Sequence, residues 1–493
     1  MQKFTCIDLF AGIGGFRIAL NKIGGGCINF SEVNNDAINV YCTNFNDKLE
    51  NNLGDITKIR ALPAHDILTA GVPCQSWSIA GRNLGFVDDR GQLWNDTLYL
   101  LNQAQPKAFV FENVKGLADP RNRDALLYIL KRIEEAGYYA NYYVLNSFDY
   151  GVPQSRVRIY IIGFKEKKFA SKFILPSPVK NYLKLAGILT GFNLNTEQKE
   201  RYAQQDLFGH IIHKRSMSLS NNHGFNDYFL FNDLRNGHST IHSWDILPTT
   251  DRQKEICYLL LKNRRKSAYG KLDGNPLALH HFLALDPTIT QEDLQALIDL
   301  GILQAEQYRF SILKSSVTLS ESENALLSCC ADNCFVIDDL KNSKKLKSKK
   351  ISVTKTVLSL LEKGVIVCEE VRYDFKNTKI STGLFGVNRI FLPSSNIFPT
   401  LVASDSNDFV TTVEITAETE KEYKAQFIER IYRKENYRKI SKEEACRIQG
   451  FPENFELPES RTRWMKLLGN SVSVPVIETL CSAILKTGVF ENT

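Results

Sequence analysis

Apolar and polar residues alternate regularly along the first 165 residues of the chain. Short, almost continuous apolar runs are separated by longer stretches in which apolar positions recur at helical spacing. Buried strands that alternate with amphipathic helices are typical of a parallel sheet covered by helices on both faces. The pattern therefore predicts an α/β fold. The predicted strands cover residues 4–10, 27–32, 66–71, 108–113, 142–147 and 157–164, and the clearest helix covers residues 123–137.

The regular alternation stops after about residue 165. Residues 170–250 show only weak periodicity, and residues 251–310 have a helical pattern. Two later segments, 291–304 and 355–368, resemble each other, because each has an apolar helix that ends at a glycine and leads into a short strand. This is the pattern of the helix-to-wing junction in a winged helix. Two unrelated helix–glycine–strand units would give the same pattern.

Composition narrows the class of protein only moderately. A chain of 493 residues is too long for one compact core, so two or more domains are expected. The net charge of +6 is compatible with a polyanionic partner. The eleven cysteines are scattered, which suits a reducing cytoplasm. No apolar run approaches the length of a membrane span, and the N-terminus lacks the features of an export signal, so we expect a cytoplasmic protein without a membrane partner.

The first predicted strand leads into a glycine-rich turn, "DLFAGIGGF" (8–16). Glycines at such a turn let a ligand approach the backbone at a helix N-terminus, although a tight turn without a ligand has the same sequence pattern. Glu32 ends the second strand, where a carboxylate can hold ribose hydroxyls, and Asp55 could meet an adenine amino group. With Asp8 in the strand, the pocket would be acidic. Such a pocket favours a cationic nucleoside such as S-adenosylmethionine over a pyrophosphate.

The segment "GVPCQSWSIAG" (71–81) places Cys74 on a stiff, polar loop directly after a predicted strand. A lone cysteine is more often a small core residue, but open α/β sheets carry their chemistry at this end of their strands. Glu112 ends another apolar run, so burial could keep its carboxyl group protonated near neutral pH. Arg156 and Arg158 share one face at the start of a strand, where they could grip a carboxylate, a phosphate or a carbonyl oxygen.

Seven motifs together resemble those of the cytosine-5 DNA methyltransferases. They are "DLFAGIGGF", "GDIT", "PCQSWSIAG", "ENV", "QSRVRIY", "RIQGFP" and "GNSV", in the family's order. The resemblance covers roughly residues 1–165 and 437–490. It implies a Rossmann-like, S-adenosylmethionine-dependent methyltransferase sheet with a large inserted target-recognition domain. It also implies methyl transfer to the 5-carbon of a specific cytosine in double-stranded DNA, through a covalent Cys74 adduct to a flipped-out base.

By the same resemblance, the enzyme protects host DNA from a cognate restriction endonuclease that acts separately, and we expect it to be a monomer. Cys74 would be the nucleophile, Glu112 would protonate or hydrogen-bond ring nitrogen N3, and Arg158 with Arg156 would hold the 2-carbonyl group or a phosphate. The implied cofactor-binding residues are Phe10, Ala11, Gly12, Gly15, Glu32, Val33, Asp55, Pro73, Leu93, Asn470 and Ser471. The implied DNA-binding residues are Gln75, Ser78, Arg82 and Gln154, with residues 78–89 as a loop that closes over DNA.

The expected domain organisation has a catalytic and cofactor-binding part, a recognition region with possible winged-helix parts, a linking motif and a final helix that returns to the catalytic domain. A basic cluster at 252–266 is a candidate phosphate contact, although a solvated helix face is an equal alternative. We expect no metal, because Cys329, Cys330 and Cys334 lack a second ligand pair at finger spacing. The expected boundaries are 1–178, 179–436, 437–464 and 465–493.

Three other functions compete with DNA methylation. A transfer-RNA cytosine methyltransferase would share the chemistry, but the large middle region disfavours it. A catalytically silent DNA-binding protein on the same scaffold would not need Cys74 together with Glu112 and Arg158. A nicotinamide oxidoreductase would require a spaced Gly-x-Gly-x-x-Gly turn and would leave the Cys74 and Glu112 motifs unexplained.

Overall fold

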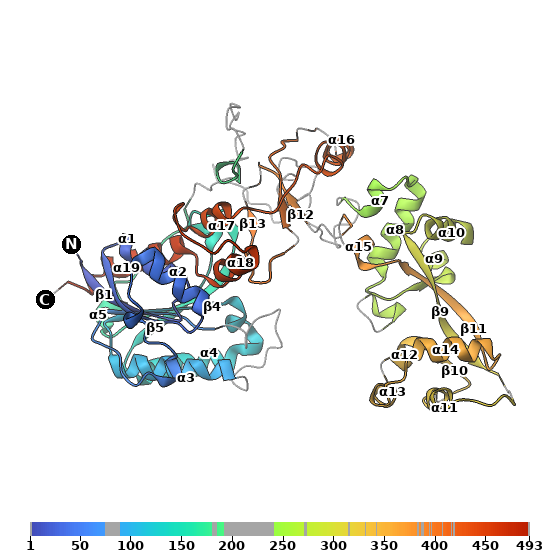
Figure 1. The fold of residues 1–493 in the computed structure, drawn as a ribbon, viewed down its shortest axis with the longest axis horizontal. Helices are drawn as coiled ribbons and strands as arrows, with labels where there is room; N and C mark the ends of the chain where they lie inside the picture. The colour runs from blue at the N-terminus through green and yellow to red at the C-terminus, as the bar shows by residue number, and fades with distance from the viewer. Residues whose placement is uncertain are drawn as a thin grey trace.

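The computed structural model describes most of the chain and shows an elongated, arched molecule (Figure 1). The N-terminal sheet lies at one end of the arch, residues 243–381 lie at the other, and residues 389–432 lie between them. The described residues are 2–73, 89–179, 185–191, 241–270, 274–313, 316–330, 332–341, 343–381, 384–385, 389–393, 395, 397–406, 408–415, 417 and 420–491.

The N-terminal sheet has six strands in the order β2-β1-β3-β4-β7-β5. The pairs β1–β2, β1–β3 and β3–β4 are parallel, whereas β7 runs antiparallel to both β4 and β5. The predicted α/β class is confirmed, but the expectation of a wholly parallel sheet is wrong at β7. Residues 147–156, which join β5 to β7, are too few for the helical crossover that a parallel pair requires. The strands are β1 (Phe4–Leu9), β2 (Gly25–Ser31), β3 (Ile67–Gly71), β4 (Ala108–Val114), β5 (Tyr139–Asn146) and β7 (Val157–Phe164).

Helices cover both faces of this sheet. Along β4, Val110 belongs to one hydrophobic core and Phe109 and Phe111 belong to the other, because successive side chains of a strand point to opposite faces. The C-terminal helix packs against the first helix and so returns to the N-terminal sheet. The first core is closed by α1 (Gly15–Lys22), α2 (Asn35–Phe45) and α19 (Val474–Lys486), and the second by α3 (Asp89–Ala104) and α4 (Arg123–Glu135).

One helical stretch is long and apolar enough to cross a membrane by composition. It is Arg461–Lys486, which comprises α18 (Arg461–Asn470) and α19. Its most apolar window is 67% buried within the protein, and the side chains of Ile477 and Leu480 are fully buried in the first core. Burial against the sheet accounts for the apolar character of this stretch.

A second, four-stranded sheet organises the far end of the arch, with the order β10-β9-β11-β8. Both predicted helix–glycine–strand runs are present, and their glycines, Gly301 and Gly364, have φ values of +69° and +65°. Their two long strands pair with each other along their whole length. The strands are β8 (Leu277–Ala278), β9 (Leu303–Ile312), β10 (Cys334–Val336) and β11 (Ile366–Phe375).

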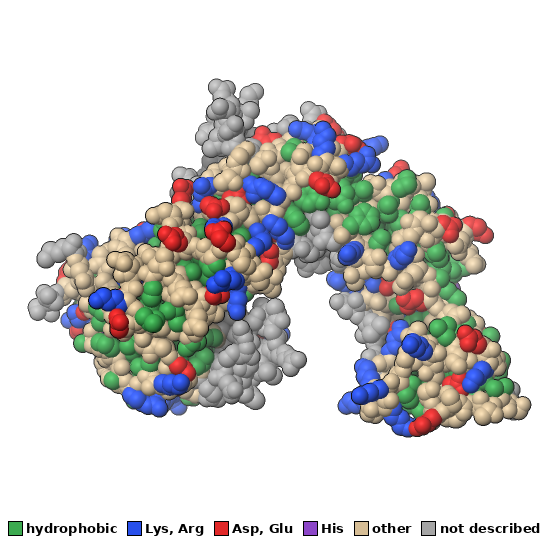
Figure 2. Space-filling model, in the orientation of Figure 1, with side chains coloured by type: hydrophobic (Ala, Val, Ile, Leu, Met, Phe, Trp, Pro, Cys, Tyr) green, Lys and Arg blue, Asp and Glu red, His purple; other side chains and the backbone are tan. Residues whose placement is uncertain are grey.

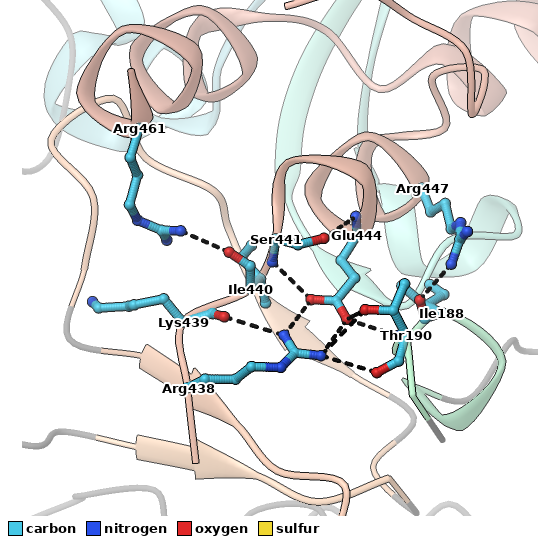
Figure 3. A network of polar contacts seen from close by, with 9 residues as sticks. All are labelled: Ile188, Thr190, Arg438, Lys439, Ile440, Ser441, Glu444, Arg447 and Arg461. Carbon is cyan, nitrogen blue, oxygen red and sulfur yellow. Dashed lines mark hydrogen bonds and ion pairs between the residues drawn. The ribbon is translucent and has the colours of Figure 1, made fainter. Parts of the chain in front are cut away.

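Figure 3 shows a polar network between residues 188–190, which follow the N-terminal sheet, and residues 438–447, which precede the C-terminal helices. The carboxylate of Glu444, in α17 (Lys442–Gln449), is fully buried and accepts hydrogen bonds from Arg438 Nη1 and Nη2, both at 2.7 Å. It also accepts from the amides of Thr190 and Ser441, at 2.8 and 2.7 Å. Burial alone would raise the pKa of Glu444, but these hydrogen bonds lower it. The network therefore fastens the outgoing chain to the returning one.

Candidate active site

One cavity of about 520 Å³ opens at the carboxyl ends of the parallel strands, where α/β sheets bind their ligands. It is bounded by the glycine-rich turn after β1, the end of β2, the loop at residue 55, the ends of β3 and β4, the start of β7 and the last turn of α18. The structure brings most of the expected site residues together here. The expected residues that line the cavity are Phe10, Gly12, Glu32, Val33, Asp55, Pro73, Leu93, Glu112, Arg156, Arg158 and Asn470.

The glycine-rich turn keeps the floor of the cavity open. Gly12 has φ +56°, and a Cβ atom built there would meet nothing within 4 Å, so its missing side chain leaves space on the cavity side. Its amide donates a hydrogen bond of 2.8 Å to Glu32 Oε2, which ties the turn to the end of β2. Gly14 has a different reason to be glycine, because a Cβ atom there would lie 2.3 Å from the Phe45 ring.

Two carboxylates and one apolar side chain line the part of the cavity next to this turn. Glu32 Oε1 accepts hydrogen bonds from the amides of Val33 and Asn34, both at 2.8 Å, which fix its orientation. Asp55 accepts from the amide and hydroxyl of Thr57, both through Oδ1, and these bonds lower the pKa of Asp55. Val33 is 66% exposed, so an apolar surface is open beside the two acids.

Three expected cofactor residues do not line the cavity. Ala11 is buried against Phe30 and Tyr41. Gly15 lies beneath the "GNSV" loop, where a Cβ atom would come within 2.9 Å of Ser471 Oγ. Ser471 is itself buried. These residues hold the walls of the cavity in place from behind.

Asp8 also lies outside the cavity, contrary to the sequence-based expectation. Its side chain is fully buried between β1 and β3, where Oδ1 accepts a hydrogen bond of 2.9 Å from Thr69. Burial raises the pKa of Asp8 well above its usual range. The acidic character of the part of the cavity next to the glycine-rich turn therefore comes from Glu32 and Asp55.

Glu112 and Arg158 form a buried pair at the edge of the cavity. Arg158 Nε lies 3.1 Å from Glu112 Oε1, and Oε1 accepts no hydrogen bond from the described residues. Burial raises the pKa of Glu112, whereas the positive charges of Arg158 and Arg156 oppose that shift. The result is a buried carboxyl group with a raised pKa, whose Oε1 faces the Arg158 guanidinium at the edge of the cavity.

The strand register brings the cysteine loop to this pair. Gly71, the last residue of β3, pairs with Glu112 of the neighbouring β4, so the chain enters the loop beside the carboxyl group. The side chain of Asn113 donates a hydrogen bond of 3.2 Å to the Val72 carbonyl and holds the start of the loop. Pro73 is described. Cys74, Gln75, Ser78 and Arg82 lie outside the described residues, as does most of the expected closing loop at 78–89.

Arg156 has a different environment from the one expected of a substrate-gripping arginine. Its guanidinium donates to the carbonyl oxygens of Leu401 at 3.2 Å, Gly469 at 3.2 Å and Ser471 at 2.6 Å. The side chain touches the cavity, but these three bonds join the start of β7 to two distant segments. Arg156 therefore positions the wall that carries Asn470.

Gln154, for which the sequence predicts a DNA contact, is fully buried in the structure and bonds within the protein. Its amide donates to Gln449 Oε1 at 2.7 Å and to the Ile448 carbonyl at 3.2 Å. Gln449 in turn donates to the carbonyl oxygens of Ser471 and Val472, at 2.9 and 3.2 Å. The sequence reasoning missed Gln449 and Asn113, although both lie inside quoted motifs, "RIQGFP" and "ENV".

Two of the six basic residues in the predicted cluster at 252–266 form close ion pairs within the protein. Arg252 lies 2.6 Å from Asp286, and Arg264 lies 2.8 Å from Asp374. These two arginines thus tie α8 (Asp251–Asn263) to the residue after α9 (Leu279–Leu285) and to β11. Among the described residues, no group of three or more His, Cys, Asp or Glu side chains is arranged to hold a metal ion.

The position of the cavity and its buried acid–guanidinium pair place the chain among the α/β methyltransferases. The comparison with protein families is more specific, because the model of the C-5 cytosine-specific DNA methylases matches residues 4–486. The chain belongs to this family and is a DNA cytosine-5 methyltransferase.

Curated relatives are similar to the chain over its whole length. The Type II methyltransferase M.HgiBI of Herpetosiphon aurantiacus is 38% identical over 494 residues, covering 100% of this chain and 99% of the relative. M.BanI of Aneurinibacillus aneurinilyticus is 30% identical over 517 residues, covering 99% of this chain and 97% of the relative. M.HpaII of Haemophilus parainfluenzae is 44% identical, but over 193 residues that cover 38% of this chain and 53% of the relative.

Proposed function

We propose that this enzyme transfers a methyl group from S-adenosylmethionine to the 5-carbon of a cytosine in a specific sequence of double-stranded DNA, with Cys74 as the nucleophile and the target base flipped out of the duplex. The observation that carries this proposal is the shared cavity. It is lined both by the residues suited to a cationic nucleoside and by the Glu112–Arg158 pair, and the strand that leads to Cys74 ends beside it.

The residues of the cavity fit S-adenosylmethionine. Glu32 is held by backbone amides with its carboxylate on the cavity, where it would accept hydrogen bonds from ribose hydroxyls. Asp55 would accept from the adenine amino group, and the exposed face of Val33 would pack against the adenine ring. Gly12 leaves open the space that a larger residue would fill. When bound, S-adenosylmethionine supplies an electrophilic methyl group, and its sulfonium charge is compatible with an acidic cavity.

The chain's own residues would activate the cytosine. The thiolate of Cys74 adds to the 6-carbon of the ring, and electron density moves towards N3 and the 5-carbon. The protonated carboxyl of Glu112 donates its proton or a hydrogen bond to N3 and so offsets the charge that builds up there. Arg158 holds the 2-carbonyl oxygen and keeps Glu112 in place. Once carbon 5 carries the transferred methyl group, a base removes the 5-proton, the electrons of that C–H bond re-form the 5,6 double bond, and the bond between carbon 6 and Cys74 breaks to release the thiolate. A proton taken up by N3 returns to Glu112.

Base flipping follows from the direction of this attack. The thiolate must approach perpendicular to the ring, and stacked neighbours block that direction inside a duplex. The names of the full-length relatives, Type II methyltransferases, support a place in a restriction-modification system. We therefore extend the proposal to protection of host DNA in the cytoplasm from a separate cognate endonuclease, with the enzyme acting as a monomer.

The test is transfer of labelled methyl groups from S-adenosylmethionine to duplex DNA, with transfer RNA assayed in parallel. We expect labelled DNA, unlabelled RNA, and loss of transfer in the variant Cys74→Ser. A matched control is Cys446→Ser, because Cys446 is buried far along the chain in α17 and has no place in the chemistry. Transfer that survives in Cys74→Ser, or transfer to RNA alone, would overturn the proposal.

A further inference from the structure

The far end of the arch is an internal duplication. The first half runs through α8 (Asp251–Asn263), β8, α9 (Leu279–Leu285), α10 (Gln291–Asp299) and β9, and the second through α11 (Glu321–Leu327), β10, α12 (Ile337–Lys341), α13 (Lys344–Ser348), α14 (Val353–Glu362) and β11. Each half starts with a helix that has a capping box, Thr250 with Gln253 in the first and Ser320 with Glu323 in the second. Each half ends in a ten-residue strand that follows a left-handed glycine.

The strand pairing is consistent with an approximate two-fold relation between the halves. Leu303, the first residue of β9, pairs with Phe375, the last of β11, and Ile366, the first of β11, pairs with Ile312, the last of β9. The short strands obey the same symmetry. Arg309 of β9 pairs with Val336 of β10, and Arg372 of β11 pairs with Ala278 of β8. Both arginines occupy the seventh position of their strands.

The two halves also share their cores, so neither is independent of the other. Tyr373 and Phe375 of the second half complete the core of the first, together with Trp244, Leu260 and Leu294. In return, Tyr308 and Phe310 of the first half complete the core of the second. Figure 1 shows the two helical groups at opposite ends of the β9–β11 pair.

The helices of the first half and the corresponding helices of the second half differ in charge. In the first half, residues 279–299 carry Asp286, Glu292, Asp293 and Asp299 and no lysine or arginine. In the second half, the equivalent residues 337–362 carry seven lysines and three acidic residues, Asp338, Asp339 and Glu362. Six of these lysines lie within residues 344–355, which contain no acidic residue, and all six are exposed. We call these six the lysine face. Its members are Lys344, Lys345, Lys347, Lys349, Lys350 and Lys355.

The lysine face is available for a ligand. Lys345 donates a hydrogen bond of 3.0 Å to the Ser328 hydroxyl, and the other five form no ion pair within the part of the chain that the structure describes. Lysines of the same lobe gather over α12 and α13 on the inner side of the arch, across the hollow from the catalytic domain (Figure 2). A stable fold does not need six unpaired charges side by side, since like charges repel one another. A polyanion in the hollow would explain both their sign and their location.

We propose that the lysine face binds the phosphate backbone of the substrate duplex, and that its symmetry mate on α9 and α10 does not touch DNA. The choice of duplex DNA rests on the proposed function. A phosphate-binding face of this kind contributes affinity and orientation but reads no bases. The duplication has thus been used asymmetrically, with one half kept as a DNA contact and the other as a structural partner that completes its core.

The test compares DNA binding by the full-length protein and by the variant K344Q/K347Q/K349Q/K350Q in a salt series, by fluorescence anisotropy. Each phosphate contact contributes about 0.9 to the slope of log Kobs against log salt, so four lost contacts reduce the slope by about 3 to 4. We expect at least about a tenfold weaker Kd at moderate salt, by the same factor for duplexes with and without the recognition sequence. The corresponding Lys→Arg variant should restore binding.

Two controls separate local contact from net charge. The variant K131Q/K167Q/K168Q/K172Q removes four positive charges from exposed lysines of the catalytic domain. The variant E292Q/D299N neutralises two exposed acids on the symmetry mate. Both control variants should bind duplex DNA with a Kd close to that of the wild type, and therefore more tightly than the four-lysine variant.

Three results would overturn the inference: unchanged duplex binding in the four-lysine variant, an equal loss in the catalytic-domain control, or a loss confined to single-stranded RNA or to an acidic protein. Failure of the proposed function would look different. In that case the wild type would transfer no methyl group to DNA although the four-lysine variant still bound duplex DNA more weakly. If both proposals hold, the four-lysine variant has a raised KM for DNA and an unchanged kcat.

Discussion

Removal of Arg438 should loosen the junction at which the chain after the N-terminal sheet, at Thr190, meets the returning chain at Glu444. Arg438 supplies two of the hydrogen bonds to the buried Glu444 carboxylate, while the Thr190 and Ser441 amides remain. A hydrogen bond to a charged group contributes about 1.5–3 kcal/mol. The Arg438 side chain is 40% exposed, so the loss lies at the lower end of the about 3–5 kcal/mol that breaking a fully buried ion pair costs. In Arg438→Ala we therefore expect local opening to become easier by about 3 kcal/mol, a factor of roughly 10².

Hydrogen exchange followed by mass spectrometry measures this opening in the peptides that contain Thr190 and Ser441. The penalty should depend on pH, because hydrogen bonds lower the pKa of Glu444 in the folded protein. The contribution of the pair is fully present above the carboxyl's unfolded pKa and is lost as the pH falls through the lowered folded value. Arg463→Ala is a matched control, since the Arg463–Asp36 pair is solvent-exposed. Equal exchange in Arg438→Ala and the control would refute the reasoning.

Three further predictions concern the cavity. Burial raises the pKa of Glu112, so activity that needs its proton should fall as the pH rises through that pKa. In Glu112→Gln, kcat should drop by about 10²–10⁴. The fall in kcat at alkaline pH should also disappear from the kcat–pH profile of this variant. Val33→Tyr should bind S-adenosylmethionine more tightly by about 0.5–1.5 kcal/mol in calorimetry, since an aromatic ring can stack on adenine, and unchanged affinity would contradict this placement. Arg156→Ala removes the hydrogen bonds to three carbonyl oxygens that hold the cavity wall, so calorimetry should show weaker S-adenosylmethionine binding. Arg158→Ala should mainly lower kcat.

Much of the catalytic fold was predictable, because its strands are short apolar runs and its helices are amphipathic. The direction of β7 was harder to predict. "VRIYIIGF" is apolar on both faces and reads the same for a parallel or an antiparallel strand. Only the short connection from β5 indicates the direction. The pairing of β9 with β11 could not be predicted either. Segments 291–304 and 355–368 look alike, but nothing in their sequences states that they face each other.

The residues of the candidate active site also fall into those that the sequence could place and those that it could not. Residues whose role depends on backbone position, such as Gly12, Glu32 and Glu112, were placed on the cavity by motif order and strand ends. Residues whose role depends on a distant partner were not. Gln154 reads as a polar surface residue, and its burial depends on Gln449, almost three hundred positions away. Single-sequence patterns carry no information about contacts at that separation.

The most direct test of the proposed mechanism is covalent trapping on DNA. A duplex that carries 5-fluorocytosine at the target position should stop the reaction after methyl transfer, because fluorine cannot leave as the proton does. With S-adenosylmethionine present, we predict a denaturant-stable complex whose cross-linked peptide contains Cys74. Absence of the complex, a cross-link at another cysteine, or a complex that still forms with Cys74→Ser would contradict the account.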